Sequence, residues 1–175
     1  MGCPTHLRNR LHKNVTKNAT AIGWTWNVAS TGDFTRGYTF NPWIGCTKVA
    51  SECAFCYADI VAKDKMGRNL WGKNALRMFM GPAYWQRLGK LSRLSGSLGH
   101  SIKVFAGSMC DLFEILCPGH PDTVRMDTAR QLMFTEIDKN PDLTFILCTK
   151  RPFNIMSLVP AHWQKAFPSN VWVLV

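Results

Sequence analysis

The sequence lacks any apolar run that approaches the roughly 20 residues needed for a membrane-spanning helix. Its first residues, MGCPTHLRNRLHKNVTKN, also lack the apolar core of a secretory signal. These absences argue against a membrane or secreted protein and favour the cytoplasm. Thiols stay reduced in that compartment, so cysteines that are close in sequence indicate a metal site rather than a disulfide framework.

Acidic residues are scarce, with 11 Asp and Glu against 21 Lys and Arg and a formal net charge of +10. An excess of this size attracts polyanions, so nucleic acid is a predicted partner. The alternative interpretation is a basic surface that only keeps the protein in solution. Residues 1–19 contain basic side chains and no acidic ones, and we expect them to form a disordered basic arm.

The chain also lacks internal repeats and low-complexity tracts, and its 175 residues with 46% hydrophobic content suffice for one core. Apolar spacing predicts a helix that begins near Glu52 and carries Cys53 and Cys56 on its first turn. Further patterns predict helices over 82–94 and 121–140, short helices after residue 150, and strands over 21–28, 101–108, 143–150 and 170–175. The alternation of strands and helices from residue 101 predicts a parallel α/β sheet with right-handed crossovers.

The last predicted strand, NVWVLV at 170–175, is apolar and is followed by no covering segment. A buried parallel strand needs cover on both faces. We therefore expect either that another protein chain covers this strand or that the sequence is a fragment of a longer protein.

Three cysteines lie within eleven residues, where Cys46, Cys53 and Cys56 follow a C-x6-C-x2-C spacing. A structural zinc site usually has four ligands in two pairs, and no second pair with ligand spacing is present. Four-iron clusters are normally held by four thiolates, so three thiolates leave one iron open for a cofactor or substrate. The spacing favours metal binding over simple burial of small apolar side chains.

The segment TFNPWIGCTKVASECAFCYAD resembles the start of a phage-associated, largely uncharacterised three-cysteine family, which is known by phage gene products thirty-seven and sixty-eight. The stretches NLWGK (69–73), VFAGSMCDLFE (104–114), FILCTKRPFNIM (145–156) and NVWVLV (170–175) resemble further segments of the same family. That family is similar to the radical S-adenosylmethionine (radical SAM) superfamily. The resemblance implies a cytoplasmic protein of a bacterial or phage-infected host cell.

The resemblance also implies a fold and a cofactor. Residues 20–175 would form the N-terminal part of a (β/α) barrel domain of radical SAM type, partial and truncated at its C-terminus. Cys46, Cys53 and Cys56 would ligate a [4Fe–4S] cluster, and Phe55 would lie beside S-adenosylmethionine; a core aromatic residue is the alternative for Phe55. The gap of six residues between the first two cysteines differs from the gap of three that is common in radical SAM enzymes.

Polar residues follow two of the predicted strands, at the end that carries function in α/β barrels. Ser108 and Asp111 would bind the amino group or ribose of the cofactor, or else cap the strand as ordinary turn residues. Lys150 and Arg151 would bind a phosphate or carboxylate; the alternatives are a solvated loop, or a helix N-cap with Pro152 at the first helical position.

The sequence thus predicts an iron–sulfur protein that performs S-adenosylmethionine-dependent radical chemistry on a nucleic-acid-related substrate. One alternative is a module that binds zinc and nucleic acid without catalysis. Another is an inactive truncated remnant, because a shortened barrel would leave its cavity open to water.

Overall fold

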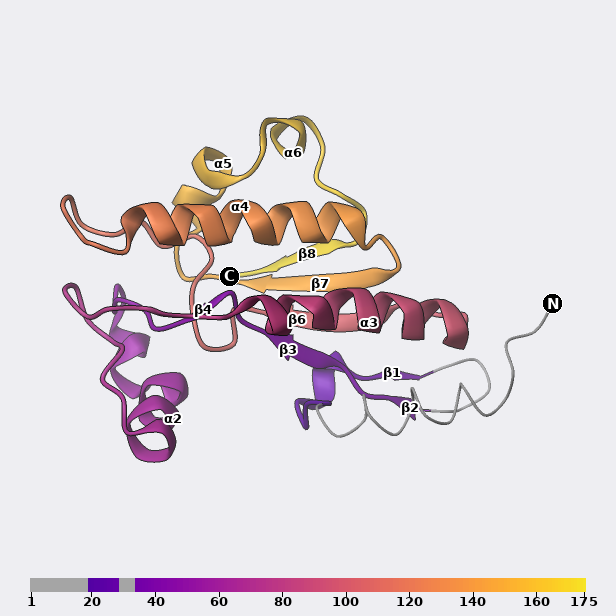
Figure 1. The fold of residues 1–175 in the computed structure, drawn as a ribbon, viewed down its shortest axis with the longest axis horizontal. Helices are drawn as coiled ribbons and strands as arrows, with labels where there is room; N and C mark the ends of the chain where they lie inside the picture. Colours follow the sequence, from indigo (N-terminus) through magenta and orange to yellow (C-terminus); the bar gives the residue numbers. More distant parts are fainter. Residues whose placement is uncertain (1–18, 29–33) are drawn as a thin grey trace.

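The computed structural model describes residues 19–28 and 34–175 (Figure 1). The predicted basic arm at 1–19 therefore lies outside the described residues, apart from its last position. Among the described residues, no helix combines the length and apolarity that crossing a membrane requires.

A parallel sheet of four strands forms the centre of the protein. Its strands lie in the order β3 (Tyr38–Phe40), β6 (Ile102–Ala106), β7 (Leu143–Cys148) and β8 (Val171–Leu174). Helix α3 (Pro82–Leu98) precedes β6, and helix α4 (Thr123–Lys139) connects β6 to β7. The predicted parallel sheet and the predicted helices over 82–94 and 121–140 are thus confirmed.

The prediction of a partial (β/α) barrel is wrong. The four parallel strands form an open sheet in which β3 and β8 are the two edges and do not pair with each other, and two small antiparallel sheets accompany it. Alternation of strands and helices specifies parallel pairing, but it does not decide whether a sheet curls far enough to close. Closure also needs a consistent tilt and stagger of the strands, which the sequence pattern did not reveal.

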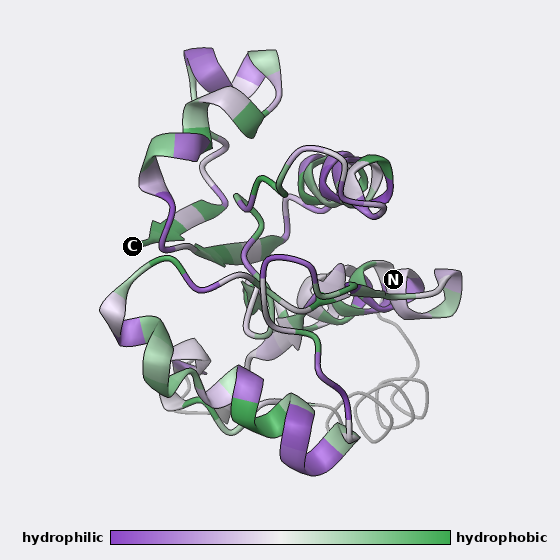
Figure 2. Cartoon of the chain, turned by 90° about the vertical axis from the view of Figure 1, so that its left-hand side faces the viewer, coloured by the Kyte–Doolittle hydropathy of each residue, from purple (hydrophilic) through white to green (hydrophobic). Residues whose placement is uncertain are grey.

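The core lies between one face of the sheet and the two long helices. Figure 2 shows α3 and α4 on the same side of the sheet. Leu88 and Leu91 of α3 and Phe134 of α4 pack with Val104 and Phe145 of the sheet in one buried cluster. Alternate side chains of β6 and β7 point to this core, and Phe105 and Ile146 on the opposite face are buried as well, so near-continuous apolar runs form these two strands.

Short elements complete the fold around this centre. Two antiparallel pairs join β1 (Asn27–Val28) with β2 (Phe34–Thr35) and β4 (Trp43–Ile44) with β5 (Met78–Phe79). The short helices are η1 (Gly23–Thr25), η2 (Ser51–Phe55), α2 (Tyr57–Met66), η3 (Pro152–Asn154), α5 (Ile155–Leu158) and α6 (Ala161–Lys165). The last three confirm the prediction of short helices after residue 150.

Three local predictions need correction. The stretch predicted as a strand over 21–28 contains η1 and is a strand only at β1, because the Thr25 hydroxyl donates a hydrogen bond to the Ile22 carbonyl and closes a turn. The cysteine helix begins at Tyr57 rather than near Glu52. Strand β8 is present but is not buried, since it pairs only with β7 and Trp172 is 52% exposed.

Candidate functional site

One cavity of about 320 Å³ brings together every residue that the sequence analysis singled out. It lies at the carboxyl ends of β6 and β7, where the η2–α2 segment faces the loops that follow these strands. In open α/β sheets, this end of the strands is where ligands usually bind. The predicted residues in its wall are Cys46, Cys53, Phe55, Cys56, Ser108, Asp111, Lys150 and Arg151.

Cys46 is placed by tight backbone packing on both sides. The preceding Gly45 has a φ of 121°, and a Cβ at that position would lie 2.6 Å from the Leu70 carbonyl oxygen. The Gly45 amide donates to the Met109 carbonyl at 3.0 Å, and the Cys46 carbonyl accepts from the Gly72 amide at 3.0 Å. Glycine is therefore required before the first cysteine of the motif.

Cys53 and Cys56 come from a different segment. Cys53 lies in η2, and Cys56 has extended backbone at the position before α2. The hydroxyl of Tyr57 donates to the Ser108 carbonyl at 2.7 Å, which ties the start of α2 to the loop after β6. This bond holds the two cysteines against the cavity.

The described cysteines are all free thiols. Burial raises the pKa of the Cys46 thiol to about 12, and the nearby Glu114 carboxylate adds to this rise. The cation of Arg151 opposes it, and its Nη1 donates to Cys46 Sγ at 3.5 Å. Cys46 must therefore lose a firmly held proton before it can bind a metal.

The pKa of the Cys53 thiol is shifted in the opposite direction. Burial opposes its ionisation, but backbone hydrogen bonds at Val49 and Ala50, helped by the charges of Lys150 and Arg151, lower the pKa of this thiol. A thiolate is the form that ligates metals. Cys53 is thus better prepared than Cys46 to act as the first ligand.

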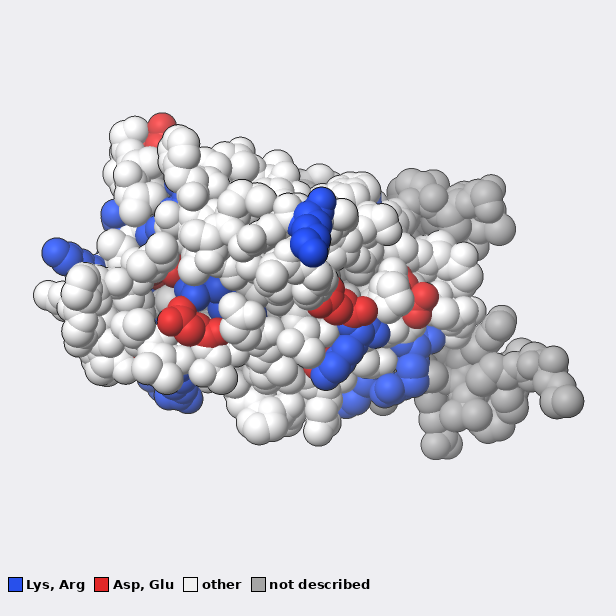
Figure 3. Space-filling model, turned by 90° about the horizontal axis from the view of Figure 1, so that it is seen from above, with Lys and Arg blue, Asp and Glu red and all other residues white. Residues whose placement is uncertain are grey.

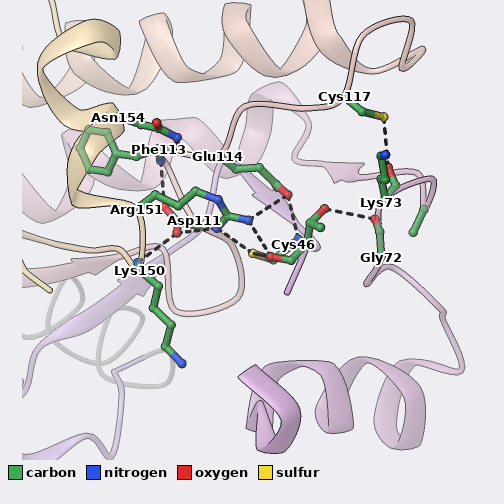
Figure 4. Close-up of polar contacts among 12 residues, drawn as sticks. Cys46, Gly72, Lys73, Asp111, Phe113, Glu114, Cys117, Lys150, Arg151 and Asn154 are labelled. Carbon is green, nitrogen blue, oxygen red and sulfur yellow. Dashed lines mark hydrogen bonds and ion pairs between the residues drawn. The ribbon is translucent and has the colours of Figure 1, made fainter. Parts of the chain in front are cut away.

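Arg151 connects the cysteine loop to two carboxylates (Figure 4). Its Nη1 donates to Asp111 Oδ2 at 2.7 Å, and its Nη2 donates to the Thr47 carbonyl at 2.6 Å and contacts Glu114 Oε1 at 3.5 Å. Both carboxylates are buried. The guanidinium therefore fixes the residue after Cys46 while it neutralises buried negative charge.

A second buried arginine, which sequence reasoning missed, completes this network. Arg77 Nη2 lies 2.9 Å from Glu114 Oε1, and its Nε donates to Glu114 Oε2 at 3.2 Å. The two side chains are 0% and 1% exposed. Glu114 also accepts from the Thr47 amide at 2.7 Å, so the pair supports the cysteine loop. No local pattern revealed it, because its members are 37 residues apart.

Asp111 and Ser108 are engaged within the protein. Asp111 Oδ1 accepts from Thr149 Oγ1 at 2.8 Å and from the Phe113 amide, while Oδ2 accepts from the Lys150 amide and from Arg151. Ser108 Oγ accepts from the side-chain amide of Asn41 at 3.0 Å. Asp111 joins the ends of β6 and β7 by these bonds.

Phe55 and Lys150 extend away from that network. Phe55 is 87% exposed, so the core-aromatic alternative does not describe it. The Lys150 side chain is exposed and extends away from the network (Figure 4). These two side chains are available to a ligand at the cavity rim.

The thiols that line the cavity are of the ligand type that iron–sulfur clusters use. Soft thiolates are the usual ligands of such a cluster, and the three motif cysteines line the same cavity with no disulfide between them. Among residues 19–28 and 34–175, no three His, Cys, Asp or Glu side chains are arranged around a single metal ion. An iron–sulfur cluster needs a different arrangement of ligands, because the cluster is larger than a single ion and each thiolate binds a separate iron atom.

The fold and the cavity define an open-sheet α/β protein with a cysteine-lined cavity at the carboxyl ends of its strands. The chain belongs to a family described as "Protein of unknown function (DUF5131)", whose model matches residues 21–175. No curated protein matches the chain, and no solved structure does.

Proposed function

We propose that the chain is an iron–sulfur protein in which Cys46, Cys53 and Cys56 hold a [4Fe–4S] cluster with one open iron. The observation that carries this proposal is that these three free thiols line one cavity, Cys46 from the loop after β4 and Cys53 and Cys56 from the η2–α2 segment. Three thiolates leave one iron without a protein ligand from the motif. The resemblance to a phage-associated three-cysteine family similar to radical SAM proteins supports the same cofactor.

We further propose that S-adenosylmethionine is the second cofactor and that the substrate is related to nucleic acid. S-adenosylmethionine on an iron–sulfur cluster supplies radical chemistry. In this chain, Arg151 would hold the Cys46 loop in place, and the exposed Phe55 and Lys150 at the cavity rim would contact the cofactor or substrate. The excess of basic residues supports the nucleic-acid assignment. Reduced thiols require a reducing compartment, so we assign the protein to the cytoplasm.

Anaerobic reconstitution with iron and sulfide tests the cysteine assignment. We expect the wild-type protein to become brown and to retain roughly four irons per chain, and we expect Cys53→Ala and Cys56→Ala to lose the visible absorbance. Cys117→Ala is the matched control, because the Cys117 thiol lies outside the cavity and donates to the Lys73 carbonyl.

Two results would contradict the proposal. One is a wild-type protein that stays colourless and binds zinc instead, which would favour the non-catalytic binding module. The other is an unchanged spectrum in the Cys53 and Cys56 variants, which would show that other residues hold the cluster.

A further inference from the structure

The face of the central sheet opposite α3 and α4 carries Phe105, Ile146 and Trp172, of which Trp172 is exposed to solvent. The strand register pairs Phe105 with Ile146 and Ile146 with Trp172, so the three side chains form a row across β6, β7 and β8. Trp24 of η1 packs edge-on against Phe105, with ring centroids 4.8 Å apart. We call the surface formed by Trp24, Phe105, Ile146 and Trp172 the aromatic face.

Two indole rings of the aromatic face are accessible to a ligand. Trp24 is 49% exposed and Trp172 is 52% exposed, whereas Phe105 and Ile146 between them are buried at 8% and 5%. Unpaired nucleobases stack on exposed aromatic rings of this kind without regard to sequence. The aromatic face therefore offers two stacking positions, the rings of Trp24 and Trp172, with the buried side chains of Phe105 and Ile146 between them.

Cations lie among these rings, and carboxylates are absent from the segments that build the face. Lys103 Nζ lies 5.5 Å from the centre of the Trp172 ring and also donates to the Trp26 carbonyl at 3.3 Å. The Arg36 guanidinium lies 5.2 Å from the centre of the Trp26 ring, which is not part of the aromatic face. Lys150 adds a third cation at the cavity rim, where the Glu52 carboxylate is its neighbour. No Asp or Glu occurs in residues 19–28, 34–40, 101–110, 143–150 or 169–175. The surface seen in Figure 3, by contrast, carries basic and acidic side chains together.

The aromatic face leads into the cavity. Phe105 belongs to both, because it packs against Trp24 and also lines the cavity that holds the three motif cysteines. A ligand that stacks on Trp24 and Trp172 and places its anionic backbone near Lys103 and Lys150 would reach the cysteines with its next unit. Alternating planar bases and phosphates match this pattern of rings and cations.

We propose that the aromatic face binds single-stranded nucleic acid and guides one nucleotide into the cysteine-lined cavity. This inference rests on the proposed function, whose substrate class and approach path it names. A duplex keeps its base faces stacked inside, so it offers nothing for Trp24 and Trp172 to stack on. A single strand is therefore the form that the surface selects.

Fluorescence anisotropy with labelled 12-nucleotide DNA and RNA single strands, and with the matching duplexes, tests the inference. We expect Trp172→Ala to weaken single-strand binding about tenfold, because stacking on one aromatic residue contributes roughly 1–3 kcal/mol. Trp24→Ala gives a second test that leaves β8 unchanged. Phe153→Ala is the matched control, since Phe153 is 97% exposed but lies in η3, outside the aromatic face.

The charge contribution is tested by the dependence of binding on salt. We expect Lys103→Gln to lower the slope of log K against log salt by about 0.7, the value for one phosphate contact with a single strand. Lys90→Gln on α3 is the control of equal charge change, and it should leave the slope unchanged. The DNA and RNA strands show which nucleic acid binds more tightly, and either preference fits the proposal.

Several outcomes would overturn the inference. The first is that the duplex and the single strand bind with equal affinity. The second is that the Phe153 and Lys90 control variants change binding as much as the Trp172 and Lys103 variants do. The third is that no strand binds and the protein instead forms a dimer in solution that Trp172→Ala disrupts. The measurements are made on cluster-free and cluster-loaded protein. A loaded protein that ignores single strands would refute the inference alone, whereas a protein that binds them but never takes up iron would refute only the cluster.

Discussion

Arg77, Arg151, Asp111 and Glu114 form a buried charge network whose common element is the loop that carries Cys46. Glu114 accepts from the Thr47 amide, and Arg151 donates to the Thr47 carbonyl, so both polar backbone groups of the residue after Cys46 are fixed. Buried charges are costly unless they are paired and hydrogen-bonded. A chain that retains four of them beside its cysteine motif uses them to position that motif.

Glu114→Gln tests, at the residue scale, how much this network stabilises the fold. The change leaves the fully buried Arg77 cation without its counter-charge, and we expect the free energy of unfolding to fall by about 3 kcal/mol. Glu136→Gln is the control, because its partner Lys139 is 62% exposed and such pairs contribute less than about 1 kcal/mol. Urea unfolding measures the free energy of unfolding of both variants. Equal losses would show that the buried network stabilises the fold no more than the exposed pair does.

The sequence predicted the members of the cavity better than their interactions. The cysteine spacing and the polar residues after the strands led to the residues that line it, because parallel strands end at the same edge of a sheet. The contacts of Arg151 with Cys46, Asp111 and Glu114 were not predictable, since they span 105, 40 and 37 residues. Only the folded chain shows that Arg151 is paired within the protein.

At the scale of elements, the long patterns predicted the structure correctly, whereas the short patterns succeeded after residue 150 and failed over 21–28 and at the start of α2. Strands β6 and β7 and helices α3 and α4 follow apolar periodicities that extend over several turns or strand positions. The start of α2 was misplaced because Cys56 adopts extended backbone, with φ −65° and ψ 110°, in a stretch of good helix formers. Tertiary contacts such as the bond from Tyr57 to Ser108 favour that geometry over helix propensity.

Gly45→Ala tests how strictly the β4 segment positions Cys46. An alanine Cβ would lie 2.6 Å from the Leu70 carbonyl oxygen at a φ of 121°, so we expect a loss of about 2 kcal/mol in unfolding free energy and weaker iron retention. Gly96→Ala in α3 is the control, because a Cβ added there would meet nothing within 4 Å and alanine favours helices. If Gly45→Ala were as stable as wild type, the backbone at Gly45 would not constrain the motif.

At the scale of the whole molecule, the open sheet separates two environments. One face packs on α3 and α4 and forms the core, whereas the other carries the aromatic face and ends at the cavity. The apolar run of β8 predicted a buried strand, but the strand lies at a sheet edge with Trp172 half-exposed. An apolar sequence shows that a segment favours burial. Whether it is buried depends on which other elements pack against it in the folded chain.

The central claim is that three cysteines hold a cluster with one open iron, and electron paramagnetic resonance of the reduced, reconstituted protein tests it most directly. We predict the signal of a reduced [4Fe–4S] cluster and a change in its g values when S-adenosylmethionine is added. A protein that shows no cluster signal would contradict the claim, and a cluster signal that S-adenosylmethionine leaves unchanged would contradict the proposal that S-adenosylmethionine binds the open iron.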